Sequence, residues 1–378
     1  MVLIPVNEPR IAKNALKYVA SCIKTGWISS SGSYLKEFED KFAQRFGVKH
    51  AITTTNGTAS LHLSIASLNI GKGDEVILPA HTMMASANAI VYTGATPVLV
   101  DVERDSWNMD VGKIEKKITK RTKAIMPVHI YGLPVDMDPV IKLAKKHNLF
   151  IVEDAAESTG AEYKGRLTGT LGDFGCFSFY ANKIITTGEG GIVLTNNDKL
   201  ANHARLLKDM AHSPKKRFLH EEIGFNYRMT NMQAALGLAQ LEELDKFLEI
   251  KIWMANLYNN LLSGLEGITL PTQRSWARNV YWMYGILIED SLSISREQFM
   301  HELLNLGVDT RTFFVPMNRQ PALLKMGLFK GEKYPISDEI GEKGLYIPSG
   351  LAITEKQIKT VCAAIGKVHK KFHGKKKQ

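Results

Sequence analysis

The chain has 378 residues and is 44% hydrophobic, so it can bury a sizeable core and is long enough for two domains. It contains no run of about 18 apolar residues, and its N-terminus lacks the apolar segment and cleavage site of a signal peptide. Its three cysteines are scattered and include no close pair, which argues against a disulfide framework or a zinc site. These features predict a globular cytoplasmic protein with no membrane span and no metal.

A net charge of +10 invites comparison with proteins that bind nucleic acid. Much of the excess lies in the loop "HSPKKRF" (212–218) and in the C-terminal tail "KVHKKFHGKKKQ" (367–378), and neither stretch has interleaved aromatic residues or a known binding motif. We therefore expect a solvated tail and some steering of anionic small molecules, with no nucleic-acid partner. A non-catalytic regulator or polyanion-binding protein that kept an enzyme's fold stays open as a distant alternative.

Short runs rich in β-forming residues alternate with helix-like or turn-rich segments through the first half of the chain. The runs are "AITTT" (51–55), "EVILP" (75–79), "TPVLVDV" (96–102), "KAIMPVHI" (123–130), "LFIVED" (149–154), "CFSFY" (176–180) and "GGIVLTN" (190–196). This alternation predicts a large, mostly parallel seven-stranded sheet with helices on both faces. In one connection we expect Asp138 to cap a helix that begins at Pro139.

The pattern changes after about residue 250 to a long helix, a strand over 281–290, a helix over 295–307, a strand over 308–314 and a final helix. Thr354 and Gln357 have the spacing of a capping box at the start of that last helix. We therefore predict a large domain over residues 1–250 and a smaller α+β domain over 251–378. Residues 1–12 could pack on the small domain.

Sites in open α/β sheets lie at the carboxyl ends of strands, and the segment "TTTNGTASLHLSIASL" (53–68) runs from such an end into a helix. The first-turn N–H groups of a helix have no intrahelical partners, so Asn56, Gly57 and Thr58 could form a phosphate site. Taken alone, the same residues also fit an ordinary turn and helix cap.

The segment "LFIVEDAAES" (149–158) ends an apolar strand with Glu153, Asp154 and Glu157. Carboxylates at a buried strand end cost desolvation energy unless a cation or hydrogen-bond donors meet them. A helix cap and an ion pair with a core arginine would also explain them.

A third segment, "CFSFYANKIITTGEGG" (176–191), places Ser178 near the end of a strand and Lys183 just beyond it. Alternation predicts that Phe177 and Phe179 face the opposite side of the sheet from Ser178. A lone lysine on a turn is normally a solvated charge. Here a phosphate site, a buried carboxylate and a serine hydroxyl converge on it, and these are the groups that pyridoxal phosphate requires.

The motifs "EDAAES", "GDFGCFSFYANKIITTGEGG" and "FNYRMTNMQAALGLAQLE" resemble those of the DegT/DnrJ family of pyridoxal-phosphate-dependent sugar-nucleotide aminotransferases. The resemblance covers nearly the whole chain and implies fold type I, with a large mostly parallel sheet domain and a smaller C-terminal α+β domain. It also implies a role for each residue that matches a family position.

Lys183 resembles the family's Schiff-base lysine, and Asp154 resembles the partner of the cofactor's ring nitrogen. Glu157 stands where many members have a glutamine beside the cofactor's 3-hydroxyl group. The implied phosphate contacts are Gly57, Thr58 and Ser178. Met83 stands where relatives usually have an aromatic side chain that stacks on the cofactor ring, and a thioether could pack there instead.

Asn226 and Arg228 resemble residues that reach into the neighbouring subunit's site, toward the phosphate and the carboxylate of glutamate respectively. The resemblance therefore implies a homodimer with composite sites, although Arg228 could instead form a salt bridge at the subunit interface. Trp27 and Ser29 match a loop that lines the substrate pocket. Asn318 stands where relatives often have a histidine, which leaves the identity of the sugar open.

The activity that the resemblance implies is transfer of the amino group of L-glutamate to C4 of a nucleotide-linked 4-keto-6-deoxysugar by ping-pong kinetics. Within the family, the resemblance favours members that act on GDP-4-keto-6-deoxymannose. The alternative is a C4 or C3 aminotransferase for a UDP- or dTDP-linked ketosugar. Members with histidine in place of the lysine remove a hydroxyl group instead, and Lys183 argues against that reaction.

Overall fold

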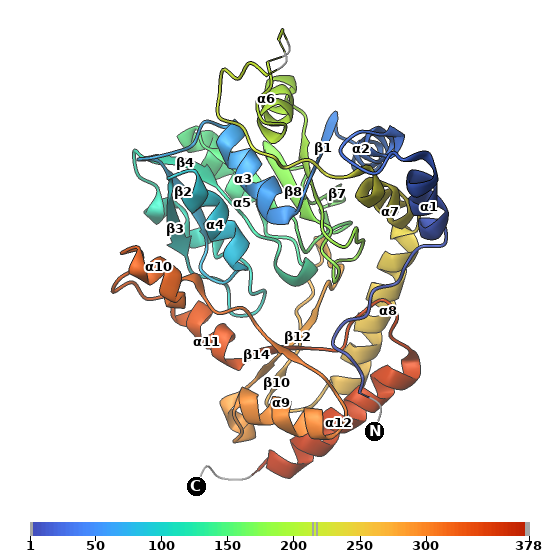
Figure 1. The fold of residues 1–378 in the computed structure, drawn as a ribbon. Helices are drawn as coiled ribbons and strands as arrows, with labels where there is room; N and C mark the ends of the chain where they lie inside the picture. The colour runs from blue at the N-terminus through green and yellow to red at the C-terminus, as the bar shows by residue number, and fades with distance from the viewer. Residues whose placement is uncertain (1–2, 214, 217, 375–378) are drawn as a thin grey trace.

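The structure, a computed structural model, describes residues 3–213, 215–216 and 218–374. The end of the basic tail, residues 375–378, and two residues of the basic loop lie outside the described residues. Across the described ranges, no helix combines the length and the apolar composition needed to cross a lipid bilayer. Figure 1 shows a large sheet with its helices above a smaller C-terminal sheet, with α8 (Leu244–Leu262) running down one side between them.

The large sheet has seven strands in the order β1-β9-β8-β5-β4-β2-β3. The strands are β1 (His50–Thr54), β2 (Glu75–Pro79), β3 (Thr96–Val100), β4 (Thr122–Ile125), β5 (Phe150–Asp154), β8 (Phe174–Ser178) and β9 (Gly191–Thr195). Strand β9 is antiparallel to both of its neighbours, and the other pairs are parallel. Each of the seven predicted runs contributes one strand, so the predicted fold class is confirmed.

Helices cover both faces of this sheet, and neighbouring residues along a strand point to opposite faces and so belong to different apolar clusters. In β8, Cys176 packs in a cluster with residues of α3 and α6, whereas Phe177 packs with residues of α2 and α7. Phe179 lies in the same cluster as Phe177, as the alternation predicted. The helices of this part are α1 (Ala15–Thr25), α2 (Ser33–Phe46), α3 (Gly57–Ser67), α4 (Met84–Tyr92), α5 (Met137–His147), α6 (Asp198–Lys208) and α7 (Asn231–Glu242).

The C-terminal part contains a four-stranded antiparallel sheet in the order β10-β12-β14-β13. Its strands are β10 (Ile268–Thr269), β12 (Tyr284–Ile288), β13 (Arg311–Thr312) and β14 (Gly344–Ile347), and its helices are α9 (Arg296–Asn305), α10 (Pro321–Lys325), α11 (Pro335–Lys343) and α12 (Glu355–Phe372). A further small sheet joins β11 (Ala277–Arg278) to β6 (Glu162–Tyr163) and β7 (Arg166–Leu167). The predicted capping box of Thr354 and Gln357 is present at the start of α12.

Helix α8 continues through residue 250, where the sequence predicts the division between the domains. The N-terminal segment contacts the C-terminal part: Ile4 forms a parallel bridge with Val308, and the Ser349 N–H donates to the Val6 carbonyl at 2.9 Å. The division at residue 250 stays a prediction, because a continuous helix crosses it.

The predicted start of α5 is wrong by two residues. The helix begins at Met137 with Asp136 as its N-cap, and Asp138 lies in the first turn, where it pairs with Lys164 at 2.6 Å. Met137 is fully buried and extends the apolar stripe that Val140 continues, so core packing starts the helix before Pro139.

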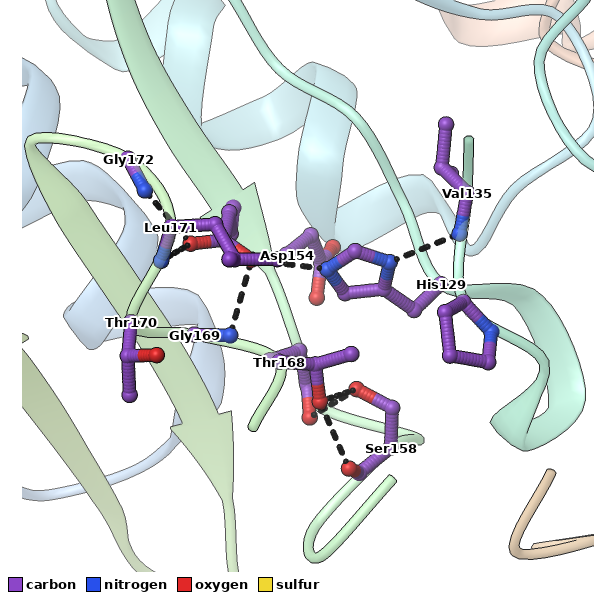
Figure 2. Close-up of polar contacts among 12 residues, drawn as sticks. His129, Val135, Asp154, Ser158, Thr168, Gly169, Thr170, Leu171 and Gly172 are labelled. Atoms are coloured by element: carbon purple, nitrogen blue, oxygen red, sulfur yellow. Dashed lines mark hydrogen bonds and ion pairs between the residues drawn. The ribbon is translucent and has the colours of Figure 1, made fainter. Parts of the chain in front are cut away.

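A fully buried carboxylate, Glu153, organises the loop between β7 and β8. It accepts hydrogen bonds from the backbone N–H groups of Gly169, Leu171 and Gly172 at 2.6–2.8 Å. It also contacts His129 Nε2 at 3.0 Å, and His129 Nδ1 accepts from the Val135 N–H, so Nε2 carries the proton. Figure 2 shows His129 between Val135 and the end of β5, with the 169–172 loop on the other side. This network fixes the strand end that carries Asp154.

Replacing Glu153 by glutamine should lower the free energy of unfolding by about 2–4 kcal/mol, because an amide NH₂ would face backbone donors and leave them unpaired. Urea denaturation of the cofactor-free protein measures this change. The matched control is Glu115→Gln at a half-exposed ion pair with Lys146, which should change the same quantity by less than about 1 kcal/mol. Equal losses in the two variants would contradict the role assigned to Glu153.

Candidate active site

A cavity of about 580 Å³ lies at the carboxyl ends of the central strands. It brings together seven of the predicted site residues: Gly57, Thr58, Met83, Asp154, Glu157, Ser178 and Lys183. These residues come from the start of α3, the loop before α4, and the ends of β5 and β8. The parallel strands deliver them to one edge of the sheet, as expected for an open α/β fold.

The start of α3 forms the anion-binding side of this cavity. The Asn56 side chain caps the helix by accepting the Ala59 N–H at 2.8 Å. A Cβ atom on Gly57 would lie only 2.7 Å from Ser178 Cβ, so glycine allows the helix end to approach β8. The helix N-terminus and the Ser178 hydroxyl therefore face the same space, which suits a phosphate group.

Asp154 is the buried carboxylate on the floor of the cavity, with 5% of its surface exposed. Its Oδ2 accepts from the Ser86 hydroxyl at 2.7 Å, and its Oδ1 accepts from the Ala156 N–H at 3.2 Å. Burial raises the pKa of Asp154 above its usual value, although these hydrogen bonds oppose the rise. A cationic ring nitrogen would offset the cost of this buried charge.

Glu157 lies beside Asp154 and is equally buried. Its Oε2 accepts from the Tyr131 N–H at 2.7 Å, and Tyr131 has a left-handed backbone with φ of 53°. Burial raises the pKa of Glu157, and the nearby Lys183 ammonium opposes the rise. Lys183 is partly buried, and burial lowers the pKa of its amine. The carboxylates of Glu157 and Asp154 oppose this fall.

Met83 lines the cavity just before α4, where its sulfur accepts from the Ala85 N–H at 3.1 Å. Half of its side chain is exposed, so a flat ring could pack against the thioether. The residues around the cavity thus supply an anion site, a buried carboxylate, an amine and an apolar wall. This set fits pyridoxal phosphate.

The described residues that line the cavity do not include Asn226, Arg228, Trp27, Ser29 or Asn318. The Arg228 guanidinium donates to Asn226 Oδ1 and to Asp209 Oδ1, both at 3.0 Å. Tyr227 does line the cavity, and its hydroxyl contacts His62 Nδ1 at 2.8 Å. Tyr227 therefore lines this chain's own cavity, whereas Asn226 and Arg228 on either side of it are absent from the described lining.

The loop that carries Trp27 and Ser29 packs on the start of α7 in this chain, and its place in the substrate pocket stays a prediction. The carbonyl of Trp27 accepts from Asn231 Nδ2 at 2.7 Å, and that of Ser29 accepts from the Asn231 N–H at 2.6 Å. More than half of the Trp27 side chain is exposed. Asn318 donates to Asp338 Oδ1 at 3.0 Å, next to Arg319.

The sequence prediction did not include three aromatic residues that the C-terminal part contributes to the cavity: Trp282, Phe314 and Tyr346. It also missed Ser86, the hydroxyl donor to Asp154. The aromatic cluster in "YWMYG" was visible in the sequence, but it belongs to a predicted strand of the second domain. Nothing in the local sequence of that strand indicates that Trp282 reaches the cavity of the first predicted domain.

A two-part α/β fold with a lysine, a buried aspartate and a helix N-terminus around one cavity fits a pyridoxal-phosphate-dependent enzyme such as an aminotransferase. Comparison with known proteins agrees. The model of the DegT/DnrJ/EryC1/StrS aminotransferase family matches residues 9–366, and the chain belongs to this family. The resemblance in the sequence motifs is therefore confirmed, as are the predicted enzyme class and cofactor.

The chain is 46% identical to the GDP-perosamine synthase of Caulobacter vibrioides, over 97% of this chain and 98% of that protein. It is 41% identical to the GDP-perosamine synthase of Escherichia coli O157:H7, over 98% and 99% of the two chains. Among solved structures, it resembles the PLP form of the putative sugar aminotransferase Spr1654 from Streptococcus pneumoniae, with a TM-score of 0.90 and 26% identity, covering 98% of this chain and 99% of that one.

The burial of Glu157 predicts a pH-dependent stability. Its pKa is raised in the folded state, so its favourable contribution is complete below the unfolded value, near 4.3, and is lost as the pH rises through the folded value. Glu157→Gln should therefore gain roughly 1–2 kcal/mol of unfolding free energy relative to the wild type between about pH 4 and pH 8.

Urea denaturation of the cofactor-free proteins across this pH range measures the difference. Glutamine keeps an oxygen that can accept the Tyr131 N–H, so the variant removes the charge and little else. The control is Glu249→Gln on the exposed side of α8, which should follow the wild type at each pH. A constant difference between Glu157→Gln and the wild type would contradict the raised pKa.

Proposed function

We propose that this aminotransferase transfers the amino group of L-glutamate to C4 of GDP-4-keto-6-deoxy-D-mannose, giving GDP-perosamine. The observation that carries the proposal is the 46% identity, over nearly the whole of both chains, with a GDP-perosamine synthase. A second and a third protein of that name are 41% and 39% identical over similar spans. The alternative is a C4 or C3 aminotransferase for a UDP- or dTDP-linked ketosugar.

The cavity residues divide the work of holding the cofactor. The N-terminus of α3, at Gly57 and Thr58, would bind the phosphate together with Ser178. The carboxylate of Asp154 would hold the ring nitrogen in its protonated form, and Met83 would pack against the ring. The chemistry that pyridoxal phosphate would supply here is that of a carrier for the amino group and an electron sink.

Lys183 holds the cofactor and moves protons in both halves of the reaction. Burial lowers the pKa of Lys183, so more of its Nζ is present as the neutral amine that accepts a proton. Its Nζ then returns a proton in the other half-reaction, when the sugar receives the amino group. The 2-oxoglutarate formed from glutamate would leave before the sugar binds, with the amino group kept on the enzyme, so ping-pong kinetics would follow.

The substrate carboxylate needs a cation, and Arg228 supplies it from a second copy of the chain. Arg228 and Asn226 do not line their own chain's cavity, which supports a homodimer in which they enter the partner's site. A guanidinium group can bind the two oxygens of a carboxylate in parallel. In this chain the Arg228 guanidinium is ion-paired with Asp209 at 3.0 Å.

The substrate is tested by incubating the enzyme with glutamate and a panel of GDP-, UDP- and dTDP-linked 4-keto-6-deoxysugars, with products identified by mass spectrometry and NMR. We expect amination at C4 of GDP-4-keto-6-deoxymannose, with the other nucleotides at least about 10-fold slower in kcat/KM.

In Lys183→Ala, the turnover rate should fall by more than the factor of roughly 100 to 10,000 that acid–base catalysis supplies.

Amination at C3, or a preference for UDP or dTDP, would favour the alternative substrate class. If no sugar is aminated and glutamate fails to bleach the visible band of the bound cofactor, the proposed reaction is wrong. A colourless protein that takes up no pyridoxal phosphate would instead support a non-catalytic role.

The composite site is tested by mixing Lys183→Ala chains with Arg228→Ala chains, each inactive alone. Each mixed dimer has one site with both residues intact, so random exchange of equal amounts should restore about a quarter of wild-type activity. Two different affinity tags verify the exchange and isolate the mixed dimer. Verified mixed dimers without activity would place Arg228 in its own chain's site or outside the site.

A further inference from the structure

The indole ring of Trp282 covers the amine of Lys183. The Nζ atom lies 3.5 Å from the centroid of the ring, well within the range in which an aromatic face attracts an ammonium group. Trp282 is 4% exposed, and it lines the cavity from the C-terminal side. The contact therefore joins two cavity residues that are 99 positions apart in the sequence.

The same indole also holds the backbone that precedes the lysine. Its Nε1–H donates to the carbonyl of Asn182 at 2.8 Å. The Lys183 N–H in turn donates to the Tyr180 carbonyl at 2.9 Å, which closes the turn. The Trp282 side chain thus contacts both the backbone just before Lys183 and the Nζ atom at the end of the lysine side chain.

Trp282 is itself held by a second lysine. Lys251, on α8, is 2% exposed, and its Nζ donates to the Trp282 carbonyl at 2.9 Å and to the Ser349 carbonyl at 2.5 Å. Burial lowers the pKa of Lys251 to about 7. Two backbone carbonyls are its hydrogen-bond partners, so it ties α8 to Trp282, two residues before β12, and to the segment after β14.

We propose that Trp282 is a positioning residue for the reaction, which holds the unlinked amine of Lys183 at the cavity, and that Lys251 fixes Trp282 in that place. The inference rests on the role given to Lys183 under the proposed function. A free lysine side chain has many rotamers, and holding its amine near the reacting atoms raises its effective concentration. The second domain therefore contributes to the chemistry as well as to the shape of the site.

The test follows the rate at which cofactor-free enzyme forms its covalent link with pyridoxal phosphate, recorded by stopped-flow absorbance between pH 6 and pH 10. Only the neutral amine attacks, so the pH profile gives an apparent pKa for Lys183, and its plateau reports how well the amine is placed. Borohydride reduction and peptide mapping of the wild type first establish whether the cofactor is attached to Lys183.

Trp282→Leu removes both the aromatic face and the N–H donor. We expect its apparent pKa to fall by about half a unit to one unit, because the ring no longer favours the ammonium form. Its plateau rate should fall about 10-fold or more, because the amine is less well held. Trp282→Phe keeps an aromatic face, so its apparent pKa should stay nearer the wild-type value while its plateau rate falls.

Lys251→Met keeps the length of the side chain and removes the two hydrogen bonds, and it should lower the plateau rate in the same direction as Trp282→Phe. The matched control is Trp276→Phe, because that tryptophan packs edge-on against Tyr163, and Tyr163 lies in a different apolar cluster from Trp282. Circular dichroism confirms the fold of each variant, and Trp282→Phe decides the result if Trp282→Leu does not fold.

Wild-type profiles in a folded Trp282→Leu protein would overturn the inference, as would a wild-type plateau in Trp282→Phe if the leucine variant does not fold. A cofactor attached to another lysine would instead overturn the role given to Lys183, so the two failures are distinguishable.

Discussion

The burial of three carboxylates at the end of β5 is the constraint on which the site depends. Glu153 is satisfied within the protein, since three backbone N–H groups and His129 surround it. Asp154 and Glu157 face the cavity, and each has fewer donors than a buried carboxylate can use. Because unpaired buried charge is costly, this edge of the sheet favours cationic groups, and a lysine lies beside it.

The site is assembled from segments that approach one another only in the folded chain. The N-terminus of α3 reaches β8 because Gly57 has no side chain to collide with Ser178. Trp282 then closes the cavity from the C-terminal part, and its carbonyl is held by Lys251 of α8. The packing of the C-terminal part against the large sheet therefore brings Trp282 over the amine of Lys183.

The sequence predicted much of the fold because the signals are local. Seven apolar runs became seven strands, and the motifs around Lys183 identified the family. The misses occur where packing overrides a local signal. Helix α5 starts before Pro139 because Met137 is buried, and the strand expected over 308–314 joins the sheet only at Arg311 and Thr312, with a separate bridge from Val308 to Ile4. Strand β14 was not predicted, although it forms the centre of the second sheet with β12.

The sequence by itself determined which chemical groups are present and near which strand ends they lie, because periodicity and spacing along the chain dictate both. It placed Asp154, Ser178 and Lys183 at one edge of the sheet. Only the tertiary structure decided that Glu153 is hydrogen-bonded by a loop, that Arg228 pairs with Asp209 outside its own chain's cavity lining and that Trp282 covers Lys183. These contacts join residues distant in sequence, and their geometry follows from how the two sheets and α8 pack together.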